Sequence, residues 1–549
     1  MRRPSTLVAA ALAFAAVRAW AGGAVATEHA RAAAAGAEVL AAGGTVVDAA
    51  LAASAAVCVV HASSCGVGGG GFALVHERDG GDVALDYRET APAGATPDRF
   101  VVDGRPDEML LRRGGLAVGV PGEVAGWTAL HARFGRLPLA RVLAPAIRLA
   151  RDGFALAESP HLAREIARQQ PLLAADPGLR AVFLAADGSV PGPDFRVVQA
   201  DLARTLAAVA AGGRAAFYDG ALAAAIAAAV AGRGGVLTAA DLRAYRPAWR
   251  RPLVGRFRGR RVVTFPPPGS GAVLLEALGL LGADDLPALG AGTPTMLHLL
   301  ATAMAQAFAD RARWLGDPAY TDVPLGALLA PPRLRALRAR MSAVRVTAPD
   351  DAFEPDAGTA NVSVVDQAGN AAVITTTINT SFGAGILVPG TGIVLNDEMD
   401  DFAIAPGVPN AFGLVGTAPN AIAPGKRPQS SMTPTVLLDG GRPEIAVGGS
   451  GGPTIVSGVL QVVLGVTAFR LHPILAVAAP RIHDQAVPAV LTVEPGIDGA
   501  TRAALARIGH RLVDVRALGA VSAVGLDADG WPVAAGDRRK DGGEAIVVR

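Results

Sequence analysis

The pattern of apolar and polar positions divides the chain into a largely helical first part and a strand-rich last part. Between 121 and 235, apolar residues recur at spacings of three and four, as in "LARVLAPAIRLARDGF", which predicts amphipathic helices. Residues 28–60 predict two helices broken at the Gly-Gly pair 43–44, and "TMLHLLATAMAQAFADRARW" predicts a long helix. After residue 359 apolar positions alternate, as in "NVSVVD" and "TPTVLLD", which predicts strands. The order of elements indicates an α/β protein.

Glycine and proline runs punctuate this pattern. "GVGGGGFALVHERDGGDVALDYRE" predicts a Gly-rich turn followed by two strands, and "FPPPGSGA" predicts a turn before a helix. "PEIAVGG" predicts a strand that leads into the helix "PTIVSGVLQVVLGV". The 549 residues show no internal repeat, and one large α/β unit can reach this size.

Charge argues against a nucleic-acid partner. The net charge is only +2, although "RAYRPAWRRPLVGRFRGRRVV" (243–263) packs eight arginines among aromatic residues. Alternating apolar positions in that stretch favour a half-exposed β-hairpin with solvated arginines. We therefore expect no nucleic-acid binding.

The first residues predict export. Arg2 and Arg3 precede an apolar stretch from Leu7 to Val17, and Ala19-Trp20-Ala21 fits a cleavage site. We expect a signal peptide over 1–21 and a periplasmic or secreted protein, the alternative being an ordinary Ala-rich helix. The chain has no uninterrupted apolar run of about 18 residues, so no stable membrane span is expected.

The two cysteines leave two possibilities open. Cys58, His61 and Cys65 have the spacing of a partial metal site, but a closed site needs four ligands. A single local disulfide is possible in an exported chain. We predict no metal and no cofactor.

Two Gly-rich motifs resemble known sites. "GVGGGG" (66–71) satisfies Gly-x-Gly-x-x-Gly, but a dinucleotide site needs the strand before the glycines and the helix after them, and here the order is reversed. "GGSGG" (448–452) fits a nucleophile elbow with Ser450, which His483 or His510 and Asp484 or Asp498 could complete. The same glycines can instead bind an oxyanion through their backbone N–H groups.

The strand-rich part carries polar groups that a strand core does not need. Together they provide a hydroxyl nucleophile, hydroxyl donors, carboxylates and an oxyanion site, which suit a substrate with one cationic and one anionic end. The residues are Thr359, Thr377, Asn379, Glu398, Asp401, Ser430, Ser431, Gly451 and Gly452.

These stretches closely resemble the γ-glutamyltranspeptidases. The resemblance runs from "SSCGVGGGGF" and "LDYRETAPAGAT" through "TTTINTSFGAGI", "NDEMDDFAIAPGVPNAFGLVG" and "PGKRPQSSMTPTVLL" to "GGSGG". It implies the four-layer αββα sandwich of the N-terminal-nucleophile hydrolases, built from one precursor that cleaves itself. The cut would fall between Gly358 and Thr359, which gives a large subunit, 22–358, and a small subunit, 359–549, paired as a heterodimer.

Cleavage would make Thr359 a catalytic residue. A threonine hydroxyl needs a base, and a free α-amine with a pKa near ~8 can supply one without any histidine. Before cleavage that nitrogen is an amide. The same hydroxyl would attack the Gly358 carbonyl first, giving an ester by an N-to-O shift that water then opens.

The resemblance implies roles for the other residues. Thr377 would orient the nucleophile, and Gly451 and Gly452 would form the oxyanion hole. Arg88, Ser430 and Ser431 would hold the α-carboxylate of a γ-glutamyl group, and Asn379, Glu398 and Asp401 its α-ammonium. The expected partners are donors such as glutathione, with water, an amino acid or a dipeptide as acceptor.

The sequence departs from the family pattern at several positions. Ala360, Asn361 and Val362 replace the usual residues after the nucleophile, which puts the rate of cleavage in question. Phe412 stands where a lid tyrosine is common and has no hydroxyl to bond Asn379. At two further positions the chain has Ser450 and Thr454 where proline and arginine are frequent.

Three alternatives remain at the level of sequence. A related glutaryl or cephalosporin acylase would share the nucleophile, but a glutaryl group has no α-ammonium for Glu398 and Asp401. A serine hydrolase would use Ser450. An uncleaved, inactive binding homologue would leave Thr359 as an internal residue.

Overall fold

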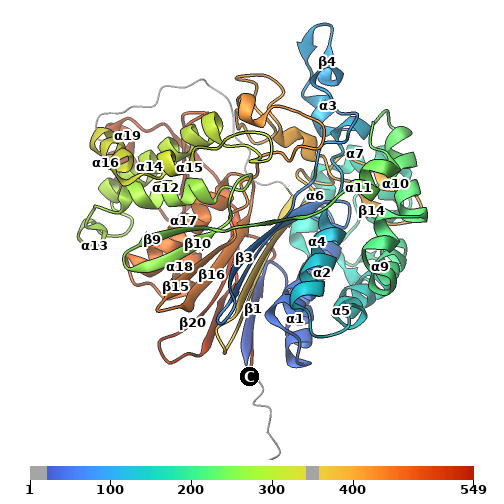
Figure 1. The fold of residues 1–549 in the computed structure, drawn as a ribbon, viewed down its shortest axis with the longest axis horizontal. Coiled ribbons are helices and arrows are strands. Elements are labelled where there is room, and N and C mark those ends of the chain that lie inside the picture. Colours follow the sequence, from blue (N-terminus) through green and yellow to red (C-terminus); the bar gives the residue numbers. More distant parts are fainter. Residues whose placement is uncertain (1–21, 342–357) are drawn as a thin grey trace, which may run out of the picture.

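Two β-sheets lie face to face, with helices covering the outer face of each (Figure 1). The computed structural model describes residues 22–341 and 358–549. Its layers run helix, sheet, sheet, helix, which confirms the predicted αββα class. The predicted signal peptide, 1–21, lies outside the described residues.

The first sheet is antiparallel and holds the predicted nucleophile on a central strand. Its strands, in spatial order, are β22 (Glu544–Val548), β1 (Gly23–Thr27), β11 (Thr359–Asp366), β12 (Ala371–Thr377), β2 (Gly70–Glu77), β3 (Gly81–Tyr87) and β8 (Ala248–Arg250). The strand predicted at "NVSVVD" is confirmed as β11, and the two strands predicted after the Gly-rich turn are confirmed as β2 and β3. Strand β1 was not predicted, because its small residues "GAVAT" show little alternation.

The second sheet packs on the inner face of the first. Its order is β21 (Pro532–Ala535), β20 (Ala520–Leu526), β16 (Arg442–Ser450), β15 (Thr435–Asp439), β10 (Arg260–Thr264) and β9 (Leu253–Phe257). Successive side chains of a strand point to opposite faces. Along β2, Phe72 and Leu74 therefore pack between the sheets, while Ala73 and Val75 face the helices. Phe72 stacks on Phe265 with ring centroids 4.1 Å apart.

Helices form the two outer layers. Those against the first sheet include α1 (Ala30–Ala41), α2 (Val46–Val60), α4 (Glu123–Phe134), α5 (Leu139–Asp152), α9 (Ala200–Tyr218) and α10 (Ala221–Ala231). Those against the second sheet include α12 (Gly271–Leu281), α14 (Pro294–Trp314), α17 (Thr454–Thr467), α18 (Pro473–Ala478) and α19 (Gly499–Ile508). All of α2 is buried, and its N-terminus carries a capping box between Thr45 and Asp48.

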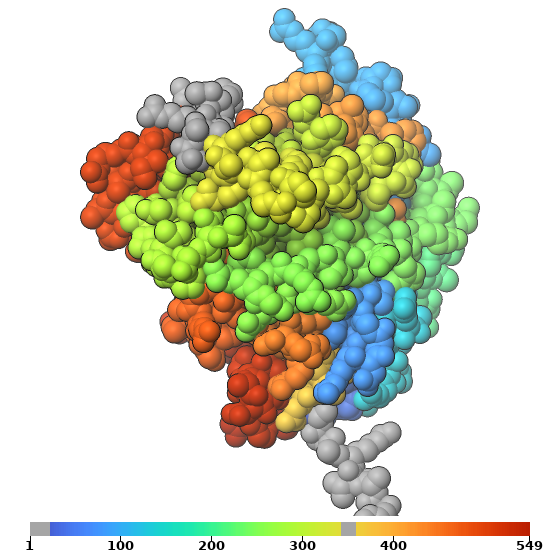
Figure 2. Space-filling model, turned by 60° about the vertical axis from the view of Figure 1, so that its left-hand side comes forward, coloured from blue at the N-terminus to red at the C-terminus, as the bar shows by residue number. Residues whose placement is uncertain are grey.

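Shorter elements complete the chain. The short helices are α3 (Met109–Arg112), α6 (Pro160–Arg168), α7 (Gln170–Ala175), α8 (Pro177–Phe183), α11 (Ala239–Ala244), α13 (Leu286–Leu289), α15 (Leu325–Leu328) and α16 (Pro331–Arg340). The short strands are β4 (Val101–Val102), β5 (Arg105–Pro106), β6 (Phe154–Ala155), β7 (Arg196–Val197), β13 (Leu387–Val388), β14 (Ile393–Val394), β17 (Ile482–His483), β18 (Leu491–Val493) and β19 (Leu512–Asp514). The β4–β5 hairpin and α3 project from the body of the molecule (Figure 2).

Two sequence interpretations are resolved by this arrangement. The glycines 66–71 follow α2 and run into the first residues of β2. The helix thus precedes them and the strand follows, the reverse of the order in a dinucleotide-binding loop, as expected. The Arg-rich stretch forms the predicted hairpin, β9–β10. Its arginines are not simply solvated, because Arg260 pairs with Glu444 (2.9 Å), and on neighbouring β8 Arg250 pairs with Asp86 (2.6 Å).

Across the described ranges, no single helix is both long and apolar enough to cross a membrane. Together, α9 and α10 meet that length and composition, as a pair bent by 56°.

Candidate active site

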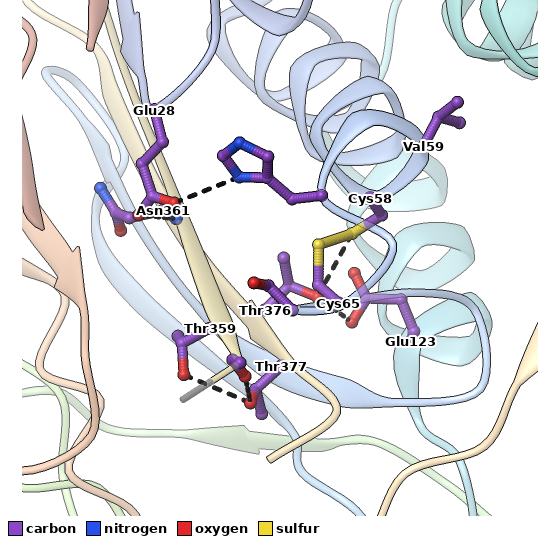
Figure 3. The surroundings of a disulfide bond; sticks show 12 residues. Glu28, Cys58, Val59, Cys65, Glu123, Thr359, Asn361, Thr376 and Thr377 are labelled. Carbon is purple, nitrogen blue, oxygen red and sulfur yellow. Dashed lines mark hydrogen bonds and ion pairs between the residues drawn. A yellow bond between two sulfur atoms is a disulfide. The ribbon is translucent and has the colours of Figure 1, made fainter. Parts of the chain in front are cut away.

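Thr359 and Thr377 face each other across two neighbouring strands. Thr359 opens β11, Thr377 ends β12, and the antiparallel register pairs them directly. Their hydroxyl oxygens lie 3.3 Å apart, and the Thr377 hydroxyl donates to the carbonyl of Gly358 at 2.5 Å (Figure 3). A hydroxyl has only one proton to donate, so the Thr359 hydroxyl is the donor to Thr377. One side chain thus contacts the predicted nucleophile and the carbonyl of the predicted scissile bond.

Gly358 occupies a position where backbone leaves no room for a side chain. A Cβ built on it would lie 2.9 Å from both the Ser63 carbonyl oxygen and the Ser64 Cα. Real Cβ atoms at that distance force a shift, and here the neighbours are backbone atoms with little freedom to move. Glycine therefore lets the chain approach the loop after α2.

That loop is closed by a disulfide between Cys58 and Cys65, whose Cα atoms are 4.9 Å apart (Figure 3). The predicted possibility of a local bridge is confirmed. A disulfide has no free thiolate, so neither cysteine is available to bind a metal. The Cys58 sulfur lies 4.0 Å from the hydroxyl of Thr376, on the strand that carries Thr377.

The residues that replace the family pattern after Thr359 still build a regular strand. The Asn361 backbone N–H donates to Glu28 (3.2 Å), and its side-chain oxygen accepts from the Thr375 hydroxyl at 2.9 Å. Gly448 of β16 packs directly on that side chain, since a Cβ there would lie 2.2 Å from the Asn361 oxygen. The second sheet therefore reaches the first within two residues of Thr359.

Arg88 lies in a buried cluster of acids. It forms ion pairs with both Glu398 and Asp401, has Glu89 at 3.8 Å, and donates to the Gln429 carbonyl at 2.9 Å. Burial opposes its charge, but the three carboxylates outweigh that effect and raise the pKa of Arg88. The structure thus brings the predicted carboxylate-binding arginine into contact with both predicted ammonium-binding acids.

Burial makes ionisation of the acids in this cluster unfavourable. Burial raises the pKa of Glu398 and of Asp401, only partly offset by the charge of Arg88, and it raises the pKa of Glu89 to about 8. Glu89 was not singled out from the sequence, although its position next to Arg88 was a usable signal.

A second buried arginine, Arg311 on α14, was also missed. It donates to the Ser270 hydroxyl (3.2 Å), which in turn donates to the backbone carbonyl of Ser430 (2.6 Å). Burial lowers the pKa of Arg311 to about 10, with the positive charge of Arg88 acting in the same direction and Asp401 opposing. The cluster therefore holds three acids and two cations.

The two predicted serines follow Gln429 directly in the chain. Ser430 and Ser431 are buried, and the Ser430 hydroxyl accepts from the backbone N–H of Met432 at 3.2 Å. The Gln429 carbonyl accepts a hydrogen bond from Arg88, so the two serines that follow Gln429 in the chain lie near the buried cluster of Arg88 and its acids.

Asn379 lies between the nucleophile and the acidic turn. Its φ of +74° is in the left-handed region, which asparagine tolerates better than most residues. Its backbone N–H donates to the Thr377 hydroxyl (2.9 Å) and its side chain donates to the carbonyl of Asp397 (3.1 Å). Asn379 therefore connects the two parts of the site.

Gly451 and Gly452 form the turn between β16 and α17, with φ values of +114° and +55°. The Thr454 hydroxyl donates to the Gly451 carbonyl at 2.6 Å. A Cβ on Gly452 would lie 2.6 Å from the ring of Phe412, so the predicted lid residue rests on this turn. The position before a helix leaves backbone N–H groups available for an anion.

The lid stretch is held by bonds that do not need a tyrosine hydroxyl. The Asn410 side chain donates to Asp401 at 2.9 Å and accepts from the Phe412 N–H at 3.0 Å. Gln485 donates to the Phe412 carbonyl at 3.0 Å. These contacts tie the lid to the acid that pairs with Arg88.

Among the described residues, the hydroxyl of the alternative nucleophile Ser450 has no hydrogen-bond partner. The ring of His483 bonds Ser457 (2.6 Å) and Gln485 (3.0 Å), while His510 bonds His298 at 2.7 Å. Ser450 lies close to Glu28 instead. The structure does not support a serine hydrolase.

Comparison with known proteins agrees with this geometry. A family model described as gamma-glutamyltranspeptidase matches residues 32–547. The chain belongs to the gamma-glutamyltranspeptidase family. The resemblance stated from the sequence is thereby confirmed, and with it the N-terminal-nucleophile hydrolase fold.

Proteins similar to this chain include both glutathione hydrolases and acylases. The chain is 37% identical over 527 residues to the glutathione hydrolase proenzyme of Escherichia coli (strain K12), covering 94% of this chain and 90% of that protein. It is 38% identical over 535 residues to the acylase ACY 1 proenzyme of Pseudomonas sp. (strain V22), covering 95% and 92%. The structure of a cephalosporin acylase from Bacillus halodurans superposes with a TM-score of 0.85 at 30% identity, covering 96% of each chain.

Proposed function

We propose that this protein is a γ-glutamyltranspeptidase and glutathione hydrolase that matures by cleavage between Gly358 and Thr359. The Thr359 hydroxyl attacks the Gly358 carbonyl, the amide becomes an ester, and water releases Gly358 as a carboxylate and Thr359 with a free α-amine. Fragments 22–358 and 359–549 stay together as a heterodimer. The contact of Thr377 with both reacting groups supports this step.

In turnover, the new α-amine accepts the proton of the Thr359 hydroxyl as the oxygen attacks the γ-carbonyl of the donor. The N–H groups of Gly451 and Gly452 stabilise the oxyanion, and the proton passes to the leaving amine. Thr359 then carries a γ-glutamyl ester. Water, an amino acid or a dipeptide takes the acyl group and restores the hydroxyl.

The observation that carries the choice of substrate is the charge of the buried cluster. Glu89, Glu398 and Asp401 surround Arg88, and Arg311 adds a second cation. A γ-glutamyl group brings both an α-carboxylate for Arg88 and an α-ammonium for the acids, so it adds no net charge. A glutaryl group brings a carboxylate for Arg88 but no α-ammonium, so Glu398 and Asp401 would gain no partner from the substrate, and buried charges need partners.

A related cephalosporin or glutaryl acylase is the second candidate, and the similarity to proteins named acylase supports it. The two are separated by kcat/KM for L-γ-glutamyl-p-nitroanilide and glutaryl-p-nitroanilide. The γ-glutamyl donor should be preferred by about 10² or more, since hydrogen bonds to a charged group contribute roughly 1.5–3 kcal/mol. Glu398→Gln should lower the ratio of kcat/KM for the γ-glutamyl donor to kcat/KM for the glutaryl donor. Equal turnover of both donors by the wild type would favour the acylase.

We also propose export to the periplasm or beyond. The disulfide Cys58–Cys65 supports this, because such bonds persist in oxidising compartments. N-terminal sequencing of the large fragment from a cell envelope extract tests it, and a start at Met1 would count against it.

A further inference from the structure

The chain holds only two lysines, and one of them contacts the predicted nucleophile. Lys540 lies in the loop between β21 and β22 and is 3% exposed. Its ammonium donates to the backbone carbonyl of Thr359 at 2.7 Å and pairs with Glu28 at 3.1 Å. It also reaches the Ser64 hydroxyl at 3.5 Å, in the loop on which Gly358 packs.

Covalent geometry places this cation near the atom that matters for catalysis. The carbonyl oxygen and the nitrogen of one residue are at most roughly 3.6 Å apart, so the ammonium, 2.7 Å from that oxygen, lies within about 6 Å of the Thr359 nitrogen. At that distance, in a buried site, a unit charge shifts the pKa of an amine by about one unit or more. The direction is downward, because a nearby cation disfavours a second positive charge.

Two carboxylates and a histidine lie around Lys540. The ring of His61 bonds Asp541 (2.7 Å) and lies 3.6 Å from Glu28. Burial opposes the charge of His61, but these two carboxylates raise its pKa, and they are held ionised by the same contacts, with the pKa of Asp541 at about 2.

His161, bonded to Ser64 at 3.0 Å, completes the surroundings. Burial and the charges of Lys540 and His61 lower its pKa well below the usual value, so it is neutral. Behind Thr359 lie Lys540, Glu28, Asp541 and His61, and Lys540 is the one bonded to Thr359 itself.

We propose that Lys540 is a positioning residue for the nucleophile, which fixes the Thr359 carbonyl and keeps the α-amine released by cleavage neutral at physiological pH, with Glu28 as its counterion. This inference rests on the proposed cleavage at Thr359. A neutral amine can accept the hydroxyl proton, whereas an ammonium cannot. Glu28 fixes Lys540 in place and moderates its effect.

The direction in which the pH profile moves distinguishes the proposed role of Lys540 from a purely structural one. The acid limb of the kcat/KM profile reports the pKa of the base in the free enzyme. Without the cation, the α-amine pKa rises, so Lys540→Met should move the acid limb to higher pH by about one unit. At pH values below both acid limbs its kcat/KM should fall roughly tenfold relative to wild type, with recovery at higher pH. Glu28→Gln leaves the cation uncompensated and should move the limb to lower pH. Lys540→Arg should keep the wild-type limb.

The matched control is Lys426→Met. Lys426 is also buried, and it also donates to a backbone carbonyl, that of Ala421 at 2.9 Å. This variant should leave the acid limb where it is. The assay is hydrolysis of L-γ-glutamyl-p-nitroanilide by the purified, cleaved enzyme between pH 5 and 9.

Shifts of opposite sign for Lys540→Met and Glu28→Gln support the proposal, whereas unmoved limbs or shifts in the same direction overturn it. If Lys540→Met remains uncleaved, Glu28→Gln alone tests the proposal. An acid limb of Glu28→Gln that stays at the wild-type pH or moves to higher pH then overturns the proposal. A wild-type chain that is not cleaved at Thr359 instead refutes the proposed function. A cleaved, active wild type with unmoved limbs refutes only the role of Lys540.

Discussion

Thr377→Val is the substitution that isolates the chemistry of cleavage. Valine has nearly the shape of threonine and keeps β12 intact, but it removes the hydroxyl that donates to the Gly358 carbonyl at 2.5 Å and accepts from Thr359 at 3.3 Å. As that carbonyl becomes tetrahedral, its oxygen gains negative charge. A positioned donor to such an oxygen is worth about 10²–10³ in rate, so cleavage should slow by that factor.

The same substitution has a cost in stability that must be separated from the rate. The Asn379 N–H, which donates to Thr377 at 2.9 Å, would lose its acceptor. An unsatisfied buried donor costs about 1–3 kcal/mol, which lowers Tm by a few degrees. Thr376→Val is the matched control, because the Thr376 hydroxyl bonds Glu123 (2.8 Å) on the other face of the same strand. It should lose similar stability and still cleave at the wild-type rate.

The assay follows disappearance of the precursor by denaturing gel and intact mass after purification from a short, cold expression. Thr377→Val should remain largely uncleaved over a time in which wild type and Thr376→Val are complete. Equal cleavage of Thr377→Val and wild type would refute the assigned role of the Thr377 hydroxyl. Equal slowing of both variants would mean that general loss of stability, and not the lost donor, controls the rate.

Three further substitutions test other parts of the site. Gly358→Ala should slow cleavage, because its Cβ would lie 2.9 Å from the Ser63 carbonyl and displace the scissile bond; cleavage at the wild-type rate would contradict the tight approach. Arg88→Lys should raise KM for a γ-glutamyl donor more than tenfold with cleavage intact, since lysine keeps the charge but not the bidentate geometry; an unchanged KM would remove Arg88 from the binding site. Cys58→Ser with Cys65→Ser should lower the unfolding free energy by about 2–4 kcal/mol in thermal or urea unfolding, and no loss would mean that the bridge does not stabilise the fold.

The sequence predicted the elements that have strong local patterns. The α2 helix, with its apolar length, and the β11–β12 pair, with its alternation and Asp-Gln-Ala-Gly-Asn turn, formed where expected. The strand β1 was missed because its five small residues, next to the predicted signal peptide, carry no alternation of polar and apolar positions.

The site was predicted through the resemblance, and residues outside its motifs were missed. Lys540 and Thr359 are 181 positions apart, and Glu28 enters from the opposite end of the chain. Local patterns cannot bring such residues together, because their contact depends on how β22, β1 and β11 align in one sheet. Arg311 was missed for a related reason, since its helix α14 reads as an ordinary buried helix.

The central claim is that Thr359 becomes a chain terminus. Intact mass and N-terminal sequencing of the purified wild-type protein test it most directly. The account predicts two fragments, one beginning Thr-Ala-Asn-Val and ending at Arg549. A single chain that runs through Gly358–Thr359, or a cut at any other bond, would contradict it.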